Sequence, residues 1–215
     1  SFPTRRSSDL DDFQIDLLCG GSQKAVSAPP GLTFVVVSDD AKEKMKNRKT
    51  PIASFYANLM AFDGYYEKKW FPYTMPISDI YGLRAAFNLI AGDKTLYERH
   101  ARIGSATRAA VKEAGLKLHL QSGYSNTVTV FDIPECTDAK SILDEMRTKY
   151  NIMLAGSFDE LSGKVIRIGH MGENARLEHM VPALEALSAT LTDLGVTLQG
   201  NLADLFLKHY REFQD

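Results

Sequence analysis

The sequence has little of several features that would assign it to a class quickly. Its two cysteines, Cys19 and Cys136, lie far apart and suit a reducing compartment better than a disulfide scaffold. No apolar run reaches membrane-spanning length, so we expect a soluble, cytoplasmic protein with no membrane partner. The 25 basic and 27 acidic residues are spread along the chain and give a net charge of −2, which creates no field that would gather nucleic acid. These absences favour a globular protein with no nucleic-acid partner.

The first ten residues, SFPTRRSSDL, need separate treatment. They contain neither the apolar stretch of a signal peptide nor the start of a capped helix. They resemble the translation of a common sequencing-library adapter. We therefore interpret residues 1–10 as an artefactual tail and expect the natural reading frame to begin upstream of Asp11, the alternative being a genuine disordered tail.

The remaining chain is long enough for one large domain or two small ones, and 44% apolar residues can build a core. Up to residue 92 the pattern predicts strands over 13–21 and 31–40, a polar helix over 41–49 capped by Ser38 or Asp39, and a helix over 77–92. The segment between those helices is aromatic and too apolar to be left in water.

From Asp93 the pattern changes to that of a small α/β domain, which we expect to cover residues 93–215 beside a separate domain over 11–92. It predicts a helix over 94–115 that ends at Gly115, followed by strands over 116–120 and 127–134. A helix over 139–150, a strand over 164–170 and helices over 177–194 and 202–213 follow. We find no internal repeat.

One lysine, Lys24, stands in the loop between the first two strands, between a glycine pair and a proline pair. A lysine amine becomes a covalent catalyst when burial or a nearby cation lowers its pKa. The glycines Gly20 and Gly21 would let a ligand approach the backbone, while Ser22 and Gln23 offer neutral donors suited to phosphate. The Walker pattern is absent. On spacing alone, an exposed loop lysine is the main alternative.

Five stretches, in this order, resemble the class V, fold-type I, pyridoxal phosphate-dependent aminotransferases, particularly the alanine/serine–glyoxylate branch. They are GSQKAVSAPPGL, RKTPIASFY, PYTMPISDIYGLRAA, SGYSNTVTVFDIP and SGKVIRIGHMG. The resemblance runs from Asp11 to the C-terminus. It implies an α/β fold in which residues 11–92 are the remnant of a large cofactor-binding domain with an incomplete mixed sheet.

The resemblance also implies roles for individual residues. Lys24 corresponds to the lysine that forms the Schiff base with pyridoxal 5′-phosphate, and Gln23 and Ser22 lie beside the cofactor phosphate. Thr74 reaches the phosphate in the partner subunit of a homodimer. Arg167 binds the substrate carboxylate; a guanidinium in an apolar strand needs an anion, although an internal ion pair would serve as well.

The implied reaction is transamination between a small amino acid, alanine- or serine-like, and a 2-oxo acid such as glyoxylate or pyruvate, with ping-pong kinetics. Alternatives are a phosphonate or ureidoglycine transaminase, a cysteine desulfurase, or a non-catalytic α/β binding module. Desulfuration is disfavoured because Gln23 stands where those enzymes usually have a histidine.

Several other residues are weaker candidates. His170 is more typical of a structural histidine than of a site residue, and Cys19 of a small buried apolar residue. The histidines have no metal-ligand spacing, so we expect no metal site. We expect the aromatic residues Phe55, Tyr56, Phe71 and Tyr73 to line the substrate mouth or the dimer seam, with packing in the core as the equal alternative.

The family's acidic partner of the pyridine nitrogen and its ring-stacking aromatic residue lie N-terminal to the lysine, in a part that this sequence does not contain. We therefore expect the chain by itself to be inactive, and to aggregate through uncovered apolar surface.

Overall fold

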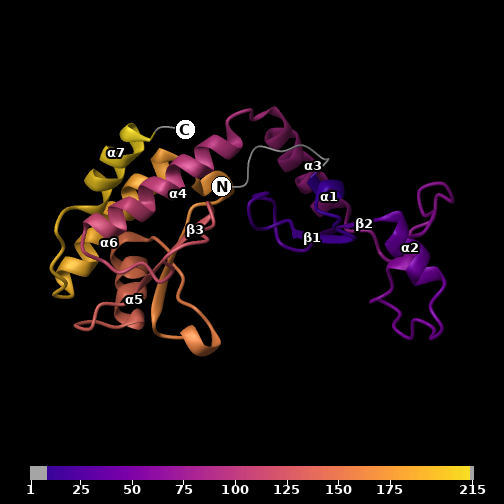
Figure 1. The fold of residues 1–215 in the computed structure, drawn as a ribbon, viewed down its shortest axis with the longest axis horizontal. Helices are drawn as coiled ribbons and strands as arrows, with labels where there is room; N and C mark the ends of the chain where they lie inside the picture. The colour runs from indigo at the N-terminus through magenta and orange to yellow at the C-terminus, as the bar shows by residue number, and fades with distance from the viewer. Residues whose placement is uncertain (1–8, 214–215) are drawn as a thin grey trace. The chain divides into compact units, whose positions relative to one another are not determined.

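The computed structural model describes residues 9–213, which form two compact units, one ending at Gly92 and the other beginning at Asp93 (Figure 1). Most of the predicted tail, residues 1–8, lies outside the described residues. The tail's last residues belong to a short helix, α1 (Asp9–Asp12). No helix in the described part is both long and apolar enough to cross a membrane.

The unit that ends at Gly92 contains a pair of antiparallel strands, β1 (Leu17–Gly21) and β2 (Thr33–Val37), with Cys19 opposite Val35. The sequence predicted both strands. Two helices, α2 (Asp39–Lys46) and α3 (Ile77–Gly92), and the short 3-10 helix η1 (Leu59–Phe62) complete the unit.

The start of α2 follows from its cap. The Ser38 hydroxyl accepts a hydrogen bond from the Ala41 amide at 3.0 Å, so the helix begins at Asp39, two residues earlier than predicted. Helix α3 has the predicted bounds.

The unit that begins at Asp93 is built around a second antiparallel pair, β3 (Val128–Asp132) and β4 (Val165–Gly169). Its helices are α4 (Leu96–Glu113), α5 (Ala139–Tyr150), α6 (Leu177–Asp193) and α7 (Leu202–Glu212). Two 3-10 helices, η2 (Asp159–Leu161) and η3 (Gly172–Asn174), lie before and after β4.

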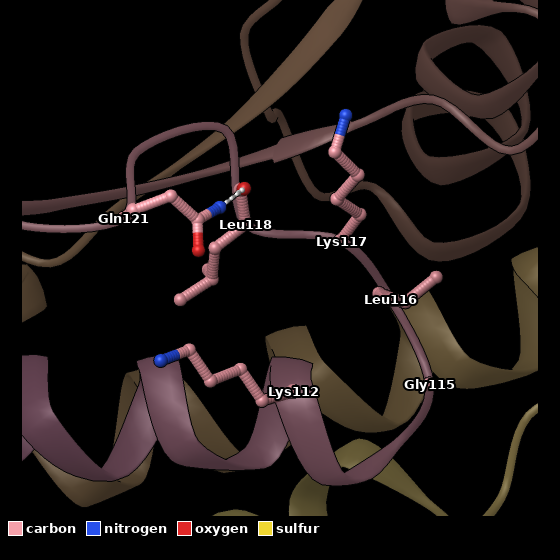
Figure 2. A pocket seen from close by; sticks show the side chains of 6 residues that line it. All are labelled: Lys112, Gly115, Leu116, Lys117, Leu118 and Gln121. Carbon is pink, nitrogen blue, oxygen red and sulfur yellow. Dashed lines mark hydrogen bonds between the residues drawn. The ribbon is translucent and has the colours of Figure 1, made fainter.

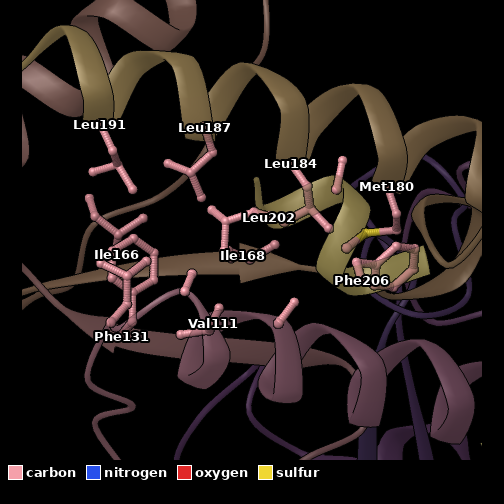
Figure 3. Close-up of a cluster of buried hydrophobic side chains, with 14 of the residues drawn as sticks. Val111, Phe131, Ile166, Ile168, Met180, Leu184, Leu187, Leu191, Leu202 and Phe206 are labelled. Carbon is pink, nitrogen blue, oxygen red and sulfur yellow. The ribbon is translucent and has the colours of Figure 1, made fainter. Parts of the chain in front are cut away.

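Apolar side chains from helices and strands meet in one core in this unit (Figure 3). Helix α6 contributes a row of residues at helical spacing, and the strands contribute alternate residues that face the same side. The fully buried large side chains include Phe131, Ile166, Leu184, Leu187 and Phe206. This core fixes the position of β4.

The predicted strand over 116–120 is wrong in extent. Only Leu118 forms a bridge, with Phe131, through hydrogen bonds from the His119 amide to Val130 and from the Asp132 amide to Lys117. The segment after the turn at Gly115 meets β3 at Leu118 and separates from it after this one bridge. Alternation of apolar residues predicted a strand where the fold has a single point of contact.

Candidate active site

The loop that carries Lys24 is a set of turns between β1 and β2. The Lys24 carbonyl accepts a hydrogen bond from the Ser27 amide at 2.9 Å, which closes a turn over residues 24–27. The Lys24 side chain is exposed, and no carboxylate of the described residues forms an ion pair with its amine. The Lys24 amine therefore has no ion-pair partner among the described residues and is accessible to solvent.

Ser22 anchors this loop. Its side chain is fully buried, and its hydroxyl donates to the Pro29 carbonyl at 2.6 Å and accepts from the Leu32 amide at 3.4 Å. Its backbone carbonyl accepts from the Ala28 amide, and its own amide donates to the Leu32 carbonyl. The hydroxyl thus bonds to the loop itself, and its predicted phosphate contact stays a prediction.

The glycine pair before Ser22 leaves room for neighbouring side chains, a packing role that the sequence did not predict. A Cβ atom on Gly20 would lie 2.0 Å from the ring of Phe34, and one on Gly21 would lie 2.9 Å from the Gln23 side-chain oxygen. Phe34 in turn makes an edge contact with Phe87 of α3, with ring centroids 5.7 Å apart. The glycines therefore admit an aromatic ring and the side chain of exposed Gln23.

The far end of the same loop packs on the start of α3. A Cβ atom on Gly31 would lie 3.3 Å from an Asp79 carboxylate oxygen, and one on Gly82 would lie 3.5 Å from Pro29. Thr74, also exposed, stands just before this helix. The structure therefore places Gln23 and Lys24 on a loop that contacts the helix that Thr74 precedes.

Arg167 lies in the middle of β4, opposite Val130 of β3. Its amide donates to the Ala155 carbonyl at 2.7 Å, and its Nε donates to the Gly156 carbonyl. The described residues offer no carboxylate within ion-pair distance of its guanidinium. The alternative of an internal ion pair is therefore not found in the part of the chain that the structure describes, where neither Nη group has a hydrogen-bond partner.

Sequence reasoning also missed Phe158, whose ring centroid lies 5.4 Å from the Arg167 guanidinium carbon. Its position nine residues before Arg167 gives no signal in the sequence, because a cation and an aromatic ring at that separation meet only when the chain between them turns back.

His170, at the end of β4, is a core residue, as the sequence favoured. Its Nδ1 donates to the Asn126 carbonyl at 3.2 Å, so its Nε2 accepts from the Thr129 hydroxyl at 2.8 Å. Burial lowers the pKa of His170 to about 4, with the positive charge of nearby Arg108 acting in the same direction. The imidazole is therefore neutral at physiological pH.

The expectation that Cys19 is buried is wrong. Its side chain is exposed, because residues on that face of β1 have no cover within their unit. Aromatic residues also gather in the same unit, where edge contacts link the rings of exposed Phe55 and Tyr56 and of half-buried Phe62, Phe71 and Tyr73. Packing against one another only partly removes these rings from water.

A shallow hollow of about 300 Å³ lies at the end of α4, with the lysines Lys112 and Lys117 and the amide of Gln121 at its rim (Figure 2). Gln121 donates to the Leu118 carbonyl at 3.3 Å, and Lys117 pairs with Asp132 at 2.7 Å. None of the predicted site residues lines this hollow. The described residues contain no group of histidine, cysteine and carboxylate side chains placed to hold a metal ion.

Comparison with known proteins decides the family. The profile of the class-V aminotransferases matches residues 4–154. The chain belongs to this family. It is 37% identical over 191 residues to an uncharacterized aminotransferase of Methanocaldococcus jannaschii, covering 87% of this chain and 49% of that protein.

Two further relatives support the assignment. The serine–glyoxylate aminotransferase of Arabidopsis thaliana is 35% identical, covering 94% of this chain and 52% of the relative. The structure of ureidoglycine–glyoxylate aminotransferase from Bacillus subtilis superposes with a TM-score of 0.88 at 30% identity, over 94% of this chain and 54% of that one. The chain thus spans about half the length of the relatives it matches.

Class-V aminotransferases use pyridoxal 5′-phosphate. The donor set of the Lys24 loop suits such a group: the Lys24 amine, unpaired among the described residues, can bond an aldehyde, and the neighbouring side-chain amide of Gln23 can donate to phosphate oxygens. The described residues therefore fit the family's cofactor.

Proposed function

We propose that the full-length protein carries out transamination between a small amino acid, alanine- or serine-like, and a 2-oxo acid such as glyoxylate or pyruvate. The proposal rests on family membership and on relatives named serine–, alanine– and aspartate–glyoxylate aminotransferases. The single structural observation that carries it is the Lys24 amine, which is exposed and unpaired among the described residues on a loop fixed by buried Ser22.

In this proposal Lys24 holds the cofactor through its amine, Gln23 and Ser22 contribute to its phosphate site, and Thr74 reaches the phosphate of the cofactor in the partner subunit. When bound, pyridoxal phosphate supplies an electron sink for the substrate Cα. The Lys24 Nζ, once released by the incoming amino acid, takes the proton from that carbon as a general base. The hydrogen bond from the Ser27 amide to the Lys24 carbonyl fixes the backbone from which this side chain extends.

Arg167 would bind the carboxylate of either reactant. Its Nε is already bonded to Gly156, so the two Nη groups present parallel donors that match the two oxygens of a carboxylate. A bound carboxylate fixes the Cα of the substrate relative to the strand. Because β4 lies in the core of its unit, the anchor is rigid.

The first experiment tests Lys24. The full-length protein is incubated with pyridoxal phosphate and borohydride, digested and analysed by mass spectrometry. We expect the label on the peptide that contains Lys24 and no label in Lys24→Ala, because borohydride fixes only an amine that has bonded the aldehyde. Lys44→Ala, on exposed α2, is the control and should keep the label. Labelling elsewhere, with position 24 unmodified, contradicts the proposal.

The second experiment tests Arg167. Replacement by alanine removes a charge-assisted bidentate contact worth roughly 1.5–3 kcal/mol, so KM for the 2-oxo acid should rise about ten- to hundredfold in steady-state assays. Arg147→Ala, an exposed arginine on α5, should leave KM unchanged. An unchanged KM in Arg167→Ala would remove the carboxylate role.

The identity of the amino donor is tested with a panel. Relatives are named for serine, alanine, aspartate, pyridoxamine and ureidoglycine. We propose a small donor, so alanine or serine should give the highest kcat/KM with glyoxylate. We also propose that the protein is a cytoplasmic homodimer, in which Thr74 reaches the partner's cofactor; sedimentation of the full-length protein tests the dimer.

A further inference from the structure

One short segment, residues 155–158, holds Arg167 at three points. The carbonyl of Ala155 accepts from the Arg167 amide, the carbonyl of Gly156 accepts from its Nε, and the ring of Phe158 lies beside its guanidinium. Three residues of one short segment thus contact the backbone, the end of the side-chain stem and the charged group of Arg167. The Nη groups are the part of Arg167 that this segment leaves open.

Phe158 contributes little to the core. Its side chain is 74% exposed, and it is not among the residues of the buried cluster. Its carbonyl accepts from the Leu161 amide at 3.1 Å, and η2 begins with the next residue. The backbone therefore presents an apolar ring to solvent at a defined place, and the ring contact found for it among the described residues is with Arg167.

We propose that Phe158 is a positioning residue, which fixes the Arg167 guanidinium so that both Nη groups face an incoming carboxylate. The proposal deepens the proposed function and rests on it. The negative face of an aromatic ring attracts a guanidinium, and the bulk of the ring removes water from beside it. An arginine side chain that is already ordered loses less rotamer freedom when it binds a ligand.

The ring and the hydrogen bond act on different freedoms of the side chain. The bond from Nε to Gly156 holds the side chain at one point, and rotation about the N–H···O direction would carry the guanidinium plane and the adjoining stem together. A ring beside that plane opposes this rotation. Loss of the ring should therefore weaken carboxylate binding without altering the Lys24 site.

The test uses the full-length holoenzyme and four variants: Phe158→Ala, Phe158→Leu, Phe158→Tyr and Arg167→Ala. The measurements are kcat and KM for glyoxylate, and competitive inhibition by propionate and by propionamide, its uncharged counterpart. A cation–ring contact at an exposed site corresponds to about a two- to fivefold change in affinity. Tyr97→Ala, which removes another exposed aromatic ring in the same unit, is the matched control.

We expect Phe158→Ala and Phe158→Leu to raise KM for glyoxylate and the inhibition constant of propionate about two- to fivefold, with kcat and propionamide inhibition unchanged. Phe158→Tyr keeps the ring and should behave as the native protein, as should Tyr97→Ala. If Phe158→Leu has the same KM for glyoxylate and the same inhibition constant for propionate as the native protein, the ring does not position the guanidinium and the proposal is overturned.

The failure of this proposal and that of the proposed function are distinguishable. If Arg167→Ala weakens propionate but Phe158→Ala does not, only the role of Phe158 is lost. If Arg167→Ala itself leaves glyoxylate and propionate unaffected, the carboxylate role of Arg167 fails and the role of Phe158 fails with it. Because Phe158 is exposed, we expect equal melting temperatures across the Phe158 variants, which would show that a change in KM does not come from a change in stability.

Discussion

At the scale of single residues, His170 shows how burial sets the chemistry of a side chain. Its two ring nitrogens are satisfied by the Asn126 carbonyl and the Thr129 hydroxyl, which fixes one neutral tautomer. Protonation would add the second hydrogen of the ring, at Nε2, where Thr129 now donates, and would place a charge in the core. The same contacts that make His170 a good structural residue make it a poor general base.

This arrangement predicts a pH dependence of stability. In the unfolded chain His170 binds a proton as the pH falls below the ordinary histidine pKa of 6.5. In the folded protein it binds this proton only when the pH falls to about 4. Stability is therefore full above pH 6.5 and falls as the pH is lowered from 6.5 to 4, by about 3 kcal/mol in total. His170→Asn keeps the donor to Asn126 but does not titrate, so its thermal midpoint should change less over this range.

Thermal unfolding of the full-length protein at pH 7.5, 6.0 and 5.0, followed by circular dichroism, measures the difference between native protein and His170→Asn. Carboxylates also titrate near the lower end of this range; Asp132, for example, has its pKa lowered by hydrogen bonds from Lys117 and His119. The comparison of slopes between the two proteins isolates the histidine. Equal slopes would contradict the assigned burial effect.

At the scale of secondary-structure elements, two helices end in the same way. Gly115 follows α4 and Gly195 follows α6, with φ of +85° and +84°. In each, the glycine amide bonds to a carbonyl three residues back, Lys112 or Thr192, and the next amide bonds five residues back. This is the Schellman motif, which requires a left-handed residue and so favours glycine.

The pair gives a matched prediction. Gly195→Ala and Gly115→Ala should each destabilise by about 1 kcal/mol, because a Cβ atom strains the left-handed conformation. A Cβ atom at Gly195 would have no other atom within 4 Å, whereas one at Gly115 would lie 3.3 Å from the side-chain nitrogen Nε2 of Gln199. Thermal unfolding should therefore show an equal or larger loss for Gly115→Ala. A larger loss for Gly195→Ala would contradict this account of crowding.

At the scale of the whole molecule, the two units differ in how much they bury. In the unit that begins at Asp93, Phe131, Phe206 and many aliphatic side chains are fully buried. In described residues 9–92, the buried apolar residues are three alanines, Ala28, Ala41 and Ala86, while Trp70 is 60% exposed. Because burial of large apolar groups is the main source of stability, the two units should differ in stability.

Limited proteolysis of the full 215-residue chain tests this difference. Chymotrypsin cleaves after aromatic residues, and Phe55, Tyr56, Tyr66 and Trp70 are all strongly exposed in the less buried unit. We expect the first cuts there and a resistant fragment that begins near Asp93. Phe158 is equally exposed but lies in a hydrogen-bonded loop of the better-packed unit, so it serves as an internal control. Early cleavage at Phe158 would contradict the prediction.

Local sequence determined most of the elements. Helix α5 has the predicted bounds because Asp138 caps its first turn, accepting from the Ser141 amide, and Asn151 ends it in a left-handed conformation with φ of +55°. Strand β4 alternates from Ile166 to Ile168, with the two isoleucines buried and Arg167 between them on the other face. Family membership and the candidate residues Lys24 and Arg167 were likewise readable from motifs, since these motifs are contiguous in the chain.

Tertiary structure decided what depends on residues far apart in the sequence. It reduced the predicted strand over 116–120 to a bridge at Leu118, left Cys19 exposed, and put the Ser22 hydroxyl into the loop's own hydrogen bonds. It also placed Phe158 beside Arg167. Spacing and propensity report local periodicity, whereas burial and side-chain partners are set by which distant segment packs on each residue, and only the fold supplies that.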